Sequence, residues 1–425
     1  MTILERIEVK KEEFVGLRRR IHEYPELSMQ EIETTKLVRE YLDHLRIENY
    51  PNGNQTGAVA ILKGAKPGPV IGLRADMDAL KLTENTNLPF ASKNAGVCHA
   101  CGHDLHTAVL LGTACLLKDY QPELCGTVKF LFQPAEEGYG GAKSMIANGA
   151  LENPCLDYIL ACHTWPEMPA GTIGVRKGAM LGASDSFKIT VKGKGGHAAH
   201  PHKGIDPVVV AAHIITEIQT IVSRRVAPVD PVVITVGHLT AGTVSNIIPG
   251  EAVMEGTVRT QNPETRIQVS EYLKQLAVGT AYAMGAEAEV EYDFGYPPTM
   301  NDPKVIDWIS EAVTEILGPE RLLQVPVSSM GSEDFSFYLE KVPGALFRIG
   351  TYDETPESKW ALLNPAIIFN EQAILTGITE GSRDGINVAA FFDHEEVGSR
   401  TKQGAGSMFL SMVLEKISLG LGQER

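Results

Sequence analysis

The spacing of apolar residues along the chain predicts where helices and strands lie. Some segments repeat apolar residues with the period of a helix, and others are short apolar runs typical of buried strands. Helical spacing of apolar residues covers 3–48, interrupted at Pro25, and returns at about 108–118. Buried strands are predicted for apolar runs bounded by glycine or proline, at 59–62, 70–74 and 127–132. Strands that alternate with helices predict an α/β fold with a largely parallel or mixed sheet flanked by helices.

The pattern changes after residue 183. From Ser186 to Lys192 apolar and polar residues alternate, which is typical of an antiparallel strand with one face in solvent. The next predicted elements are a helix, two strands and a helix: 208–222, 232–236, 252–260 and 263–284. A compact α+β domain is therefore expected at 184–296. A helix at 304–317 and a strand at 345–349 resume the first pattern, so the first domain is discontinuous, 1–183 and 297–381, and 382–425 form an appended tail.

The length and net charge of the chain limit which classes of protein it can belong to. A chain of 425 residues is too long for one compact core, so two domains are expected. The formal net charge of -15 argues against a nucleic-acid partner. No apolar run reaches the length of a membrane span, and the N-terminus lacks the pattern of a signal peptide. Cytoplasmic location without a membrane partner is the resulting prediction, and six cysteines in so long a chain do not indicate a disulfide scaffold.

Thiol and imidazole side chains are concentrated between Cys98 and His106. Such ligands suit zinc, manganese, cobalt or nickel, whereas magnesium and calcium prefer oxygen. The glycine in Cys101-Gly102-His103 allows a turn tight enough for both side chains to approach one ion. Two alternatives remain. A structural zinc knuckle would need a second cysteine pair, which the sequence lacks, and the other alternative is a buried cysteine among solvated histidines.

Glu136 and Glu137 follow the predicted strand 127–132, at the strand end where ligands of α/β sheets collect. A metal-bound water becomes hydroxide near neutral pH, and a neighbouring carboxylate can take its proton and pass it to a leaving nitrogen. We assign Glu136 as this base and Glu137 as a metal ligand, together with Cys101, His103 and His163. The pattern predicts a hydrolase, although an isolated Glu-Glu pair would more often be a solvent-exposed loop.

Family motifs are recognisable in six segments: 18–27, 74–80, 99–104, 132–138, 195–202 and 330–335. They resemble the metal-dependent amidohydrolases that include hippurate hydrolase, N-acetyl-amino-acid deacetylases and plant indole-acetyl-amino-acid hydrolases. The resemblance runs from about residue 5 to about residue 380. It implies a two-metal catalytic domain and an inserted lid or dimerisation domain of a homodimer. The expected metal is Zn, Mn, Co or Ni, with one or two ions per chain because Leu363 stands where a ligand is expected.

The resemblance also implies roles for single residues. Cys101 would bridge two ions, with His103 and His163 on one, Glu137 on the other and Asp78 orienting the site. In the inserted domain, three residues would act on the substrate. His197 would stabilise the oxyanion in a neighbouring active site, Asn246 would hold the substrate, and Arg259 would meet its carboxylate.

The activity implied is hydrolysis of the amide bond of N-acyl, chiefly N-acetyl, amino acids into a carboxylate and a free amino acid. The alternatives are a dipeptidase or aminopeptidase, and an activity-impaired metal-binding homologue. The last follows from Leu363, which stands where the family has a histidine before Asn-Pro or Ser-Pro. Leucine cannot bind a metal, so the ion shared with Glu137 should be held weakly.

The tail departs from the amidohydrolase pattern. Residues 386–405 resemble a fragment of the aspartyl aminopeptidases, in which an apolar strand also leads into a Glu-Glu pair. The other metal-binding segments of that family have no match upstream, so the fragment cannot complete a site alone. Replacement of the missing ligand by His394 or Glu395 is the less favoured alternative.

Overall fold

The computed structural model describes residues 3–138 and 140–378, which form two compact units. Of the described residues, unit 1 contains those up to 178, 301–326 and 337–378, and unit 2 contains Ala179–Met300 and Val327–Ser336. The predicted domain boundaries remain predictions, and the predicted tail 382–425 lies outside the described residues. Among the described helices none is both long and apolar enough to cross a membrane.

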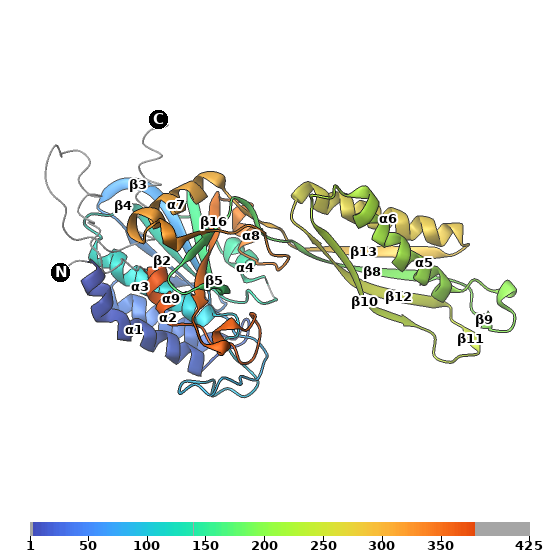
Figure 1. Ribbon diagram of the computed structural model, residues 1–425, viewed down its shortest axis with the longest axis horizontal. Coiled ribbons are helices and arrows are strands. Elements are labelled where there is room, and N and C mark those ends of the chain that lie inside the picture. The colour runs from blue at the N-terminus through green and yellow to red at the C-terminus, as the bar shows by residue number, and fades with distance from the viewer. Residues whose placement is uncertain (1–2, 139, 379–425) are drawn as a thin grey trace. The chain divides into compact units, whose positions relative to one another are not determined.

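An eight-stranded mixed sheet forms the centre of unit 1 (Figure 1). Its strands, in sheet order, are β1 (Glu48–Pro51), β2 (Ala58–Lys63), β4 (Cys125–Gln133), β3 (Lys66–Asp76), β5 (Tyr158–Pro169), β16 (Gly344–Tyr352), β6 (Ile173–Val175) and β15 (Leu322–Gln324). The four central strands, β4, β3, β5 and β16, run parallel, whereas β1, β2 and β6 introduce antiparallel pairs. The predicted fold class is confirmed.

The helices of the described chain are α1 (Ile3–Glu23), α2 (Ile32–His44), α3 (His103–Asp119), α4 (Gly141–Ala147), α5 (Pro207–Thr220), α6 (Pro263–Ala283), α7 (Pro303–Ile316), α8 (Ser336–Leu339) and α9 (Gln372–Ile378). The central one is α3, whose residues from His103 to Leu117 are buried, with α1 and α9 packed against it. The predicted start of this helix at about 108 was wrong. Gly102, with φ 88°, lets the chain enter the helix at His103.

Two of the long strands, β5 and β13, were not predicted. In β5 the run from Ile159 to Thr164 is buried on both faces, so it shows no alternation, and it is too short to be distinguished from a helix by period. Along β13 (Glu287–Tyr296) exposed side chains alternate mainly with half-buried ones, and none is fully buried. This strand lies at the edge of its sheet, where fewer neighbours cover its inward side chains. The first omission matters because β5 carries His163.

Unit 2 is a four-stranded antiparallel sheet covered on one face by α5 and α6 (Figure 1). The sheet order is β10 (Val232–Ala241), β12 (Glu251–Thr260), β8 (Ser184–Lys192) and β13. Its core is formed by the inward residues of the strands and by one face of each helix, among them Ile189, Ile214, Met254 and Leu273. Short ladders join β9 (Gly196–His197) to β11 (Ile247–Ile248) and β7 (Gly178–Leu181) to β14 (Thr299–Asn301).

A buried ion pair supports unit 2 at the start of β8. The carboxylate of Asp185 is 2% exposed and accepts hydrogen bonds from Arg266 Nη2 at 2.6 Å, from the Tyr292 hydroxyl at 2.9 Å and from the Gly295 amide at 3.1 Å. Because every one of these donors is in the same unit, the pair joins α6, β8 and β13. Removing one partner would leave the other charge buried without compensation.

We therefore expect Asp185→Asn to lower the free energy of unfolding by about 3–5 kcal/mol, because the Arg266 guanidinium loses its counter-charge. Urea unfolding followed by circular dichroism measures the change. The matched control is Lys188→Gln, which breaks the exposed pair of Lys188 with Glu291 on the same strand and should leave the unfolding midpoint unchanged. Equal losses in both variants would contradict the role given to Asp185.

Candidate metal centre

The turn after β4 is held by two buried carboxylates from other parts of unit 1. The Ala135 amide donates to Glu31 Oε1 at 2.9 Å, and the next two amides donate to Asp78, Glu136 N to Oδ1 at 3.0 Å and Glu137 N to Oδ2 at 3.1 Å. Ala135 has φ 55°, a left-handed conformation that a non-glycine residue adopts only when its surroundings hold it there. Three successive amides are thus bound, which sets the direction of both glutamate side chains.

Two imidazoles are oriented by backbone carbonyls. His103 Nδ1 donates to the carbonyl oxygen of Asp78 at 2.9 Å, and His163 Nδ1 donates to that of Thr164 at 2.7 Å. Each bond leaves Nε2 directed at the site, which is the arrangement of a metal-binding histidine. His163 Nε2 lies 3.5 Å from Cys101 Sγ, and His103 Nε2 lies 3.8 Å from Glu137 Oε1.

The predicted ligands fall into two overlapping groups. Ligand atoms of Cys101, His103 and His163 all lie within 4.8 Å of one another, and so do those of His103, Glu136 and Glu137. His103 Nε2 and Glu137 Oε1 are buried without a hydrogen-bond partner among the described residues. A thiol, imidazoles and carboxylates with unpaired buried atoms fit a divalent transition ion.

The charges of the site also favour a cation. Burial lowers the pKa of His163 to about 3, so this ring is neutral and its lone pair is available. Burial raises the pKa of the Cys101 thiol well above its usual range, with the Glu137 charge adding to the shift, and burial raises the pKa of Glu137 as well. A bound divalent ion would reverse these shifts, because ligation favours the deprotonated thiol and carboxylate.

A second layer beneath the site was not predicted. Asp76 accepts from His106 Nδ1 at 2.6 Å and from Arg74 Nη1 at 2.7 Å, while His106 Nε2 accepts from the Thr164 amide at 2.8 Å. Asp76 is fully buried, yet its pKa lies well below its usual range because His103 and Arg74 outweigh the cost of burial. This layer therefore fixes the Thr164 peptide that orients His163. Asp76 and Arg74 lie in the segment 74–80 that carried the resemblance, which was the available signal.

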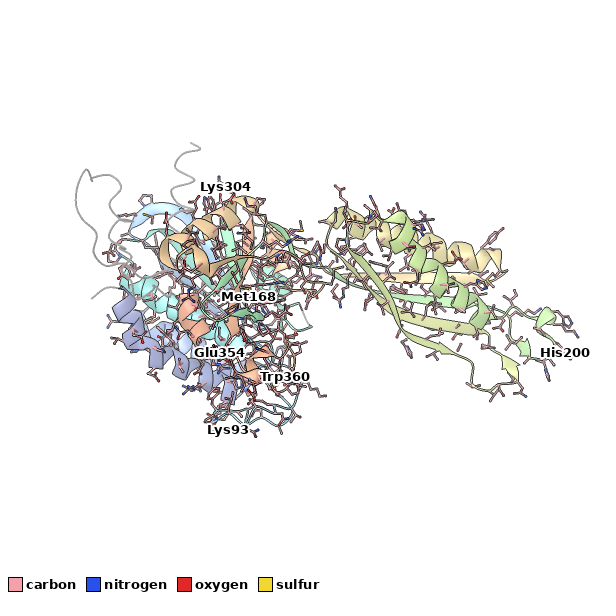
Figure 2. All side chains as sticks on the ribbon, viewed as in Figure 1. Lys93, Met168, His200, Lys304, Glu354 and Trp360 are labelled. Atoms are coloured by element: carbon pink, nitrogen blue, oxygen red, sulfur yellow. The ribbon has the colours of Figure 1, made fainter. Side chains whose placement is uncertain are left out.

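The remaining predicted residues lie in unit 2. His197 and Asn246 are exposed neighbours, because β9 pairs with β11 and the Ala198 amide donates to the Asn246 carbonyl at 3.1 Å. Figure 2 shows His200 on the same loop, at the end of unit 2 that carries β9. Arg259 is half-buried on β12, and its Nη1 lies 3.3 Å from the Ser332 hydroxyl. The structure thus brings His197 and Asn246 together, whereas Arg259 lies farther along the unit, on a separate strand.

Leu363 lies beside the ligand turn. Its amide donates to the carbonyl of Ala100, the residue before Cys101, at 2.9 Å. The residue has φ 66°, and its side chain is 49% exposed. A left-handed conformation is unfavourable for leucine, and an exposed leucine gains little from burial. The leucine side chain therefore does not explain why the backbone of Leu363 is left-handed.

Comparison with known proteins identifies the family. The sequence profile of Peptidase family M20/M25/M40 matches residues 72–378. The chain belongs to this family. It is 43% identical to the N-acetylcysteine deacetylase of Bacillus subtilis (strain 168), over 85% of this chain and 92% of that protein. It is 41% identical to thermostable carboxypeptidase 1 of Saccharolobus solfataricus, over 80% and 86%.

A solved structure agrees with the fold of this M20 chain. The YXEP protein of Bacillus subtilis, a dinuclear metal-binding peptidase of the M20 family, matches with a TM-score of 0.76 and 39% identity over 87% of this chain and 96% of that one. The predicted family and the prediction of a metal-dependent hydrolase are confirmed.

The resemblance of the tail to an aminopeptidase is confirmed as well. The profile of the aminopeptidase I zinc metalloproteases (M18) matches residues 364–425. His394 and Glu395, the alternative ligands, lie outside the described residues.

The buried Glu31 carboxyl should make stability depend on pH. Burial raises the pKa of Glu31 from 4.5 to about 7, so between these values the folded state binds a proton that the unfolded state has lost. Stability contributed by this proton is present below pH 4.5 and is lost as the pH rises through about 7. The variant Glu31→Gln cannot ionise at this position. Relative to this variant, the free energy of unfolding of the wild type should therefore fall by up to about 3 kcal/mol as the pH rises from 4.5 through about 7.

Unfolding with urea at pH 5, 6, 7 and 8, in the presence of a chelator, measures the difference. The matched control is Glu33→Gln, two residues along the chain in α2, whose exposed side chain should follow the wild type. A difference between wild type and Glu31→Gln that does not change with pH would contradict the assignment.

Proposed function

We propose that this chain hydrolyses the amide bond of N-acyl amino acids, N-acetyl amino acids in particular, and releases a carboxylate and the free amino acid. The observation that carries the proposal is the convergence of Cys101, His103 and His163 beside Glu136 and Glu137. The 43% identity to an N-acetylcysteine deacetylase supports the choice of substrate class. Cytoplasmic location and a homodimer are part of the same proposal.

In this proposal Cys101, His103, Glu137 and His163 hold the metal, and Asp78 orients the ligands through the turn amides and the His103 ring. A divalent transition ion bound by these residues supplies an acidified water and polarisation of the substrate carbonyl. The neutral His163 ring and the carbonyl-bound Nδ1 of His103 keep both Nε2 atoms available. His197 of a neighbouring subunit would stabilise the oxyanion, and Asn246 would hold the substrate.

Glu136 is the proton carrier of the proposed reaction. Its carboxylate takes a proton from water as the water oxygen adds to the amide carbon, and it gives that proton to the nitrogen as the carbon–nitrogen bond breaks. The side chain is 6% exposed, so bulk water does not compete strongly for the proton. The binding of its amide to Asp78 holds the carboxylate beside Glu137 and His103.

A second candidate is cleavage of a peptide bond at a carboxyl terminus. It is favoured by the 41% identity to a thermostable carboxypeptidase, which would present the same amide to the same groups. The two activities differ in the group on the acyl side of the bond, and substrates that vary this group distinguish them.

A substrate panel tests the proposed activity. N-acetyl amino acids and hippurate should be hydrolysed, dipeptides and aspartyl peptides more slowly, and a chelator should abolish all rates. Glu136→Gln should lower kcat by about 10²- to 10⁴-fold, whereas the exposed Glu123→Gln should leave it unchanged. Rapid cleavage of peptides without hydrolysis of any N-acyl amino acid would contradict the proposal.

We further propose that Leu363 leaves one metal weakly held. Metal analysis of purified wild-type protein should find about one firmly bound ion per chain, and Leu363→His should raise this to about two and increase the rate. Cys101→Ser should lose metal, and Cys155→Ser, at an exposed cysteine, should not. Two tightly held ions in the wild type would defeat this interpretation.

A further inference from the structure

Arg348 on β16 is a buried cation with an unpaired edge. The residue is 5% exposed, and its Nε and Nη2 atoms find no hydrogen-bond partner among the described residues. These nitrogens form one side of the guanidinium, the side that can donate two parallel hydrogen bonds to one carboxylate. Burial of such donors without a partner is costly, so an acceptor that reached them would be bound favourably.

Trp165 stacks on this guanidinium. The Arg348 Cζ atom lies 3.5 Å from the centroid of the Trp165 ring, close enough for a strong cation–π contact. Stacking occupies a face of the guanidinium and leaves its edge for hydrogen bonding. Burial lowers the pKa of Arg348 only to about 10, so the group stays charged at neutral pH.

The backbone of Arg348 lies beside that of His163, a residue of the candidate metal centre. Arg348 is in register with His163 on the neighbouring parallel strand, so the two side chains lie on the same face of the sheet, about 4.8 Å apart at the backbone. The Trp165 ring, which covers Arg348, has its centroid 6.4 Å from that of His163. A ligand on Arg348 would thus lie one strand away from the group formed by Cys101, His103 and His163.

We propose that Arg348 binds the carboxylate of the N-acyl amino acid, with Trp165 as the residue that positions it. This inference rests on the proposed function. In such a substrate only the nitrogen and the α carbon separate the amide carbon from the carboxylate carbon, a span comparable with the spacing of two strands. A carboxylate on Arg348 would therefore place the amide carbon near His163.

Two other pairings compete with this one. Glu167 is an exposed carboxylate on β5 whose charge attracts Arg348, although no ion pair forms between them. Arg259, the residue first expected to meet the substrate carboxylate, already has the Ser332 hydroxyl near its Nη1. Substitution of each residue separates the three possibilities.

Binding without turnover measures the contribution of Arg348. In a Glu136→Gln background, calorimetry gives the affinities for N-acetylcysteine and for its carboxamide, which lacks the charge. Arg348→Met should weaken binding of the acid by about 10- to 100-fold and that of the amide by less than about 3-fold. Arg348→Lys should fall between, because it keeps the charge but loses the paired donors. Glu167→Gln should leave the acid affinity unchanged.

An unchanged ratio of acid to amide affinity in Arg348→Met would overturn the inference, and so would a selective loss of acid binding in Arg259→Met or Glu167→Gln alone. Thermal unfolding of each variant verifies folding, and if Arg348→Met does not fold, the ratio in Arg348→Lys decides. Failure of the wild type to hydrolyse any N-acyl amino acid would instead overturn the proposed function. If the wild type hydrolyses N-acyl amino acids but Arg348→Met keeps the ratio of acid to amide affinity, only the role of Arg348 is overturned.

Discussion

The binding of three successive amides by two buried carboxylates is the constraint on which the candidate site depends. Glu31 comes from the start of α2 and Asp78 from the segment after β3, and together they hold the turn from Ala135 to Glu137. Asp78 also accepts from His103 through its carbonyl. One residue thus sets the direction of two glutamates and one imidazole, so that their ligand atoms meet although they come from distant parts of the chain.

The cost of this arrangement is a concentration of negative charge. Asp76, Asp78, Glu136 and Glu137 lie together in a largely buried region, and Arg74 and His103 supply only part of the opposite charge. Carboxylates brought together out of water repel one another, and a divalent cation is the group that removes this repulsion most effectively. The pKa of Glu137 is raised, by burial first and then by the charges of Asp78 and Asp76, so a bound cation that favours its ionised form would couple metal binding to stability.

Two residues of unit 1 bear on the candidate site in different ways. Leu363 has a left-handed backbone beside Cys101 and an apolar side chain that cannot bind an ion. Arg348, in register with His163 on the neighbouring strand, has a guanidinium whose Nε and Nη2 find no hydrogen-bond partner among the described residues. In our proposals the first affects how firmly the metal is held and the second which substrates are bound, so metal content and substrate preference can be tested separately.

The amino-acid sequence determined the α/β class and the family and indicated the candidate ligands, because short motifs such as Cys101-Gly102-His103 and Glu136-Glu137 combine their chemistry within a few residues. The start of α3 at His103 could not be predicted, since it depends on the left-handed Gly102. Nor could the roles of Glu31, His106 and Arg348 be predicted. Each depends on a contact between segments far apart in the chain, and the periodicity of a segment contains no information about such a partner. The tertiary structure alone decided which imidazole nitrogen faces the site and which buried charge is left unpaired.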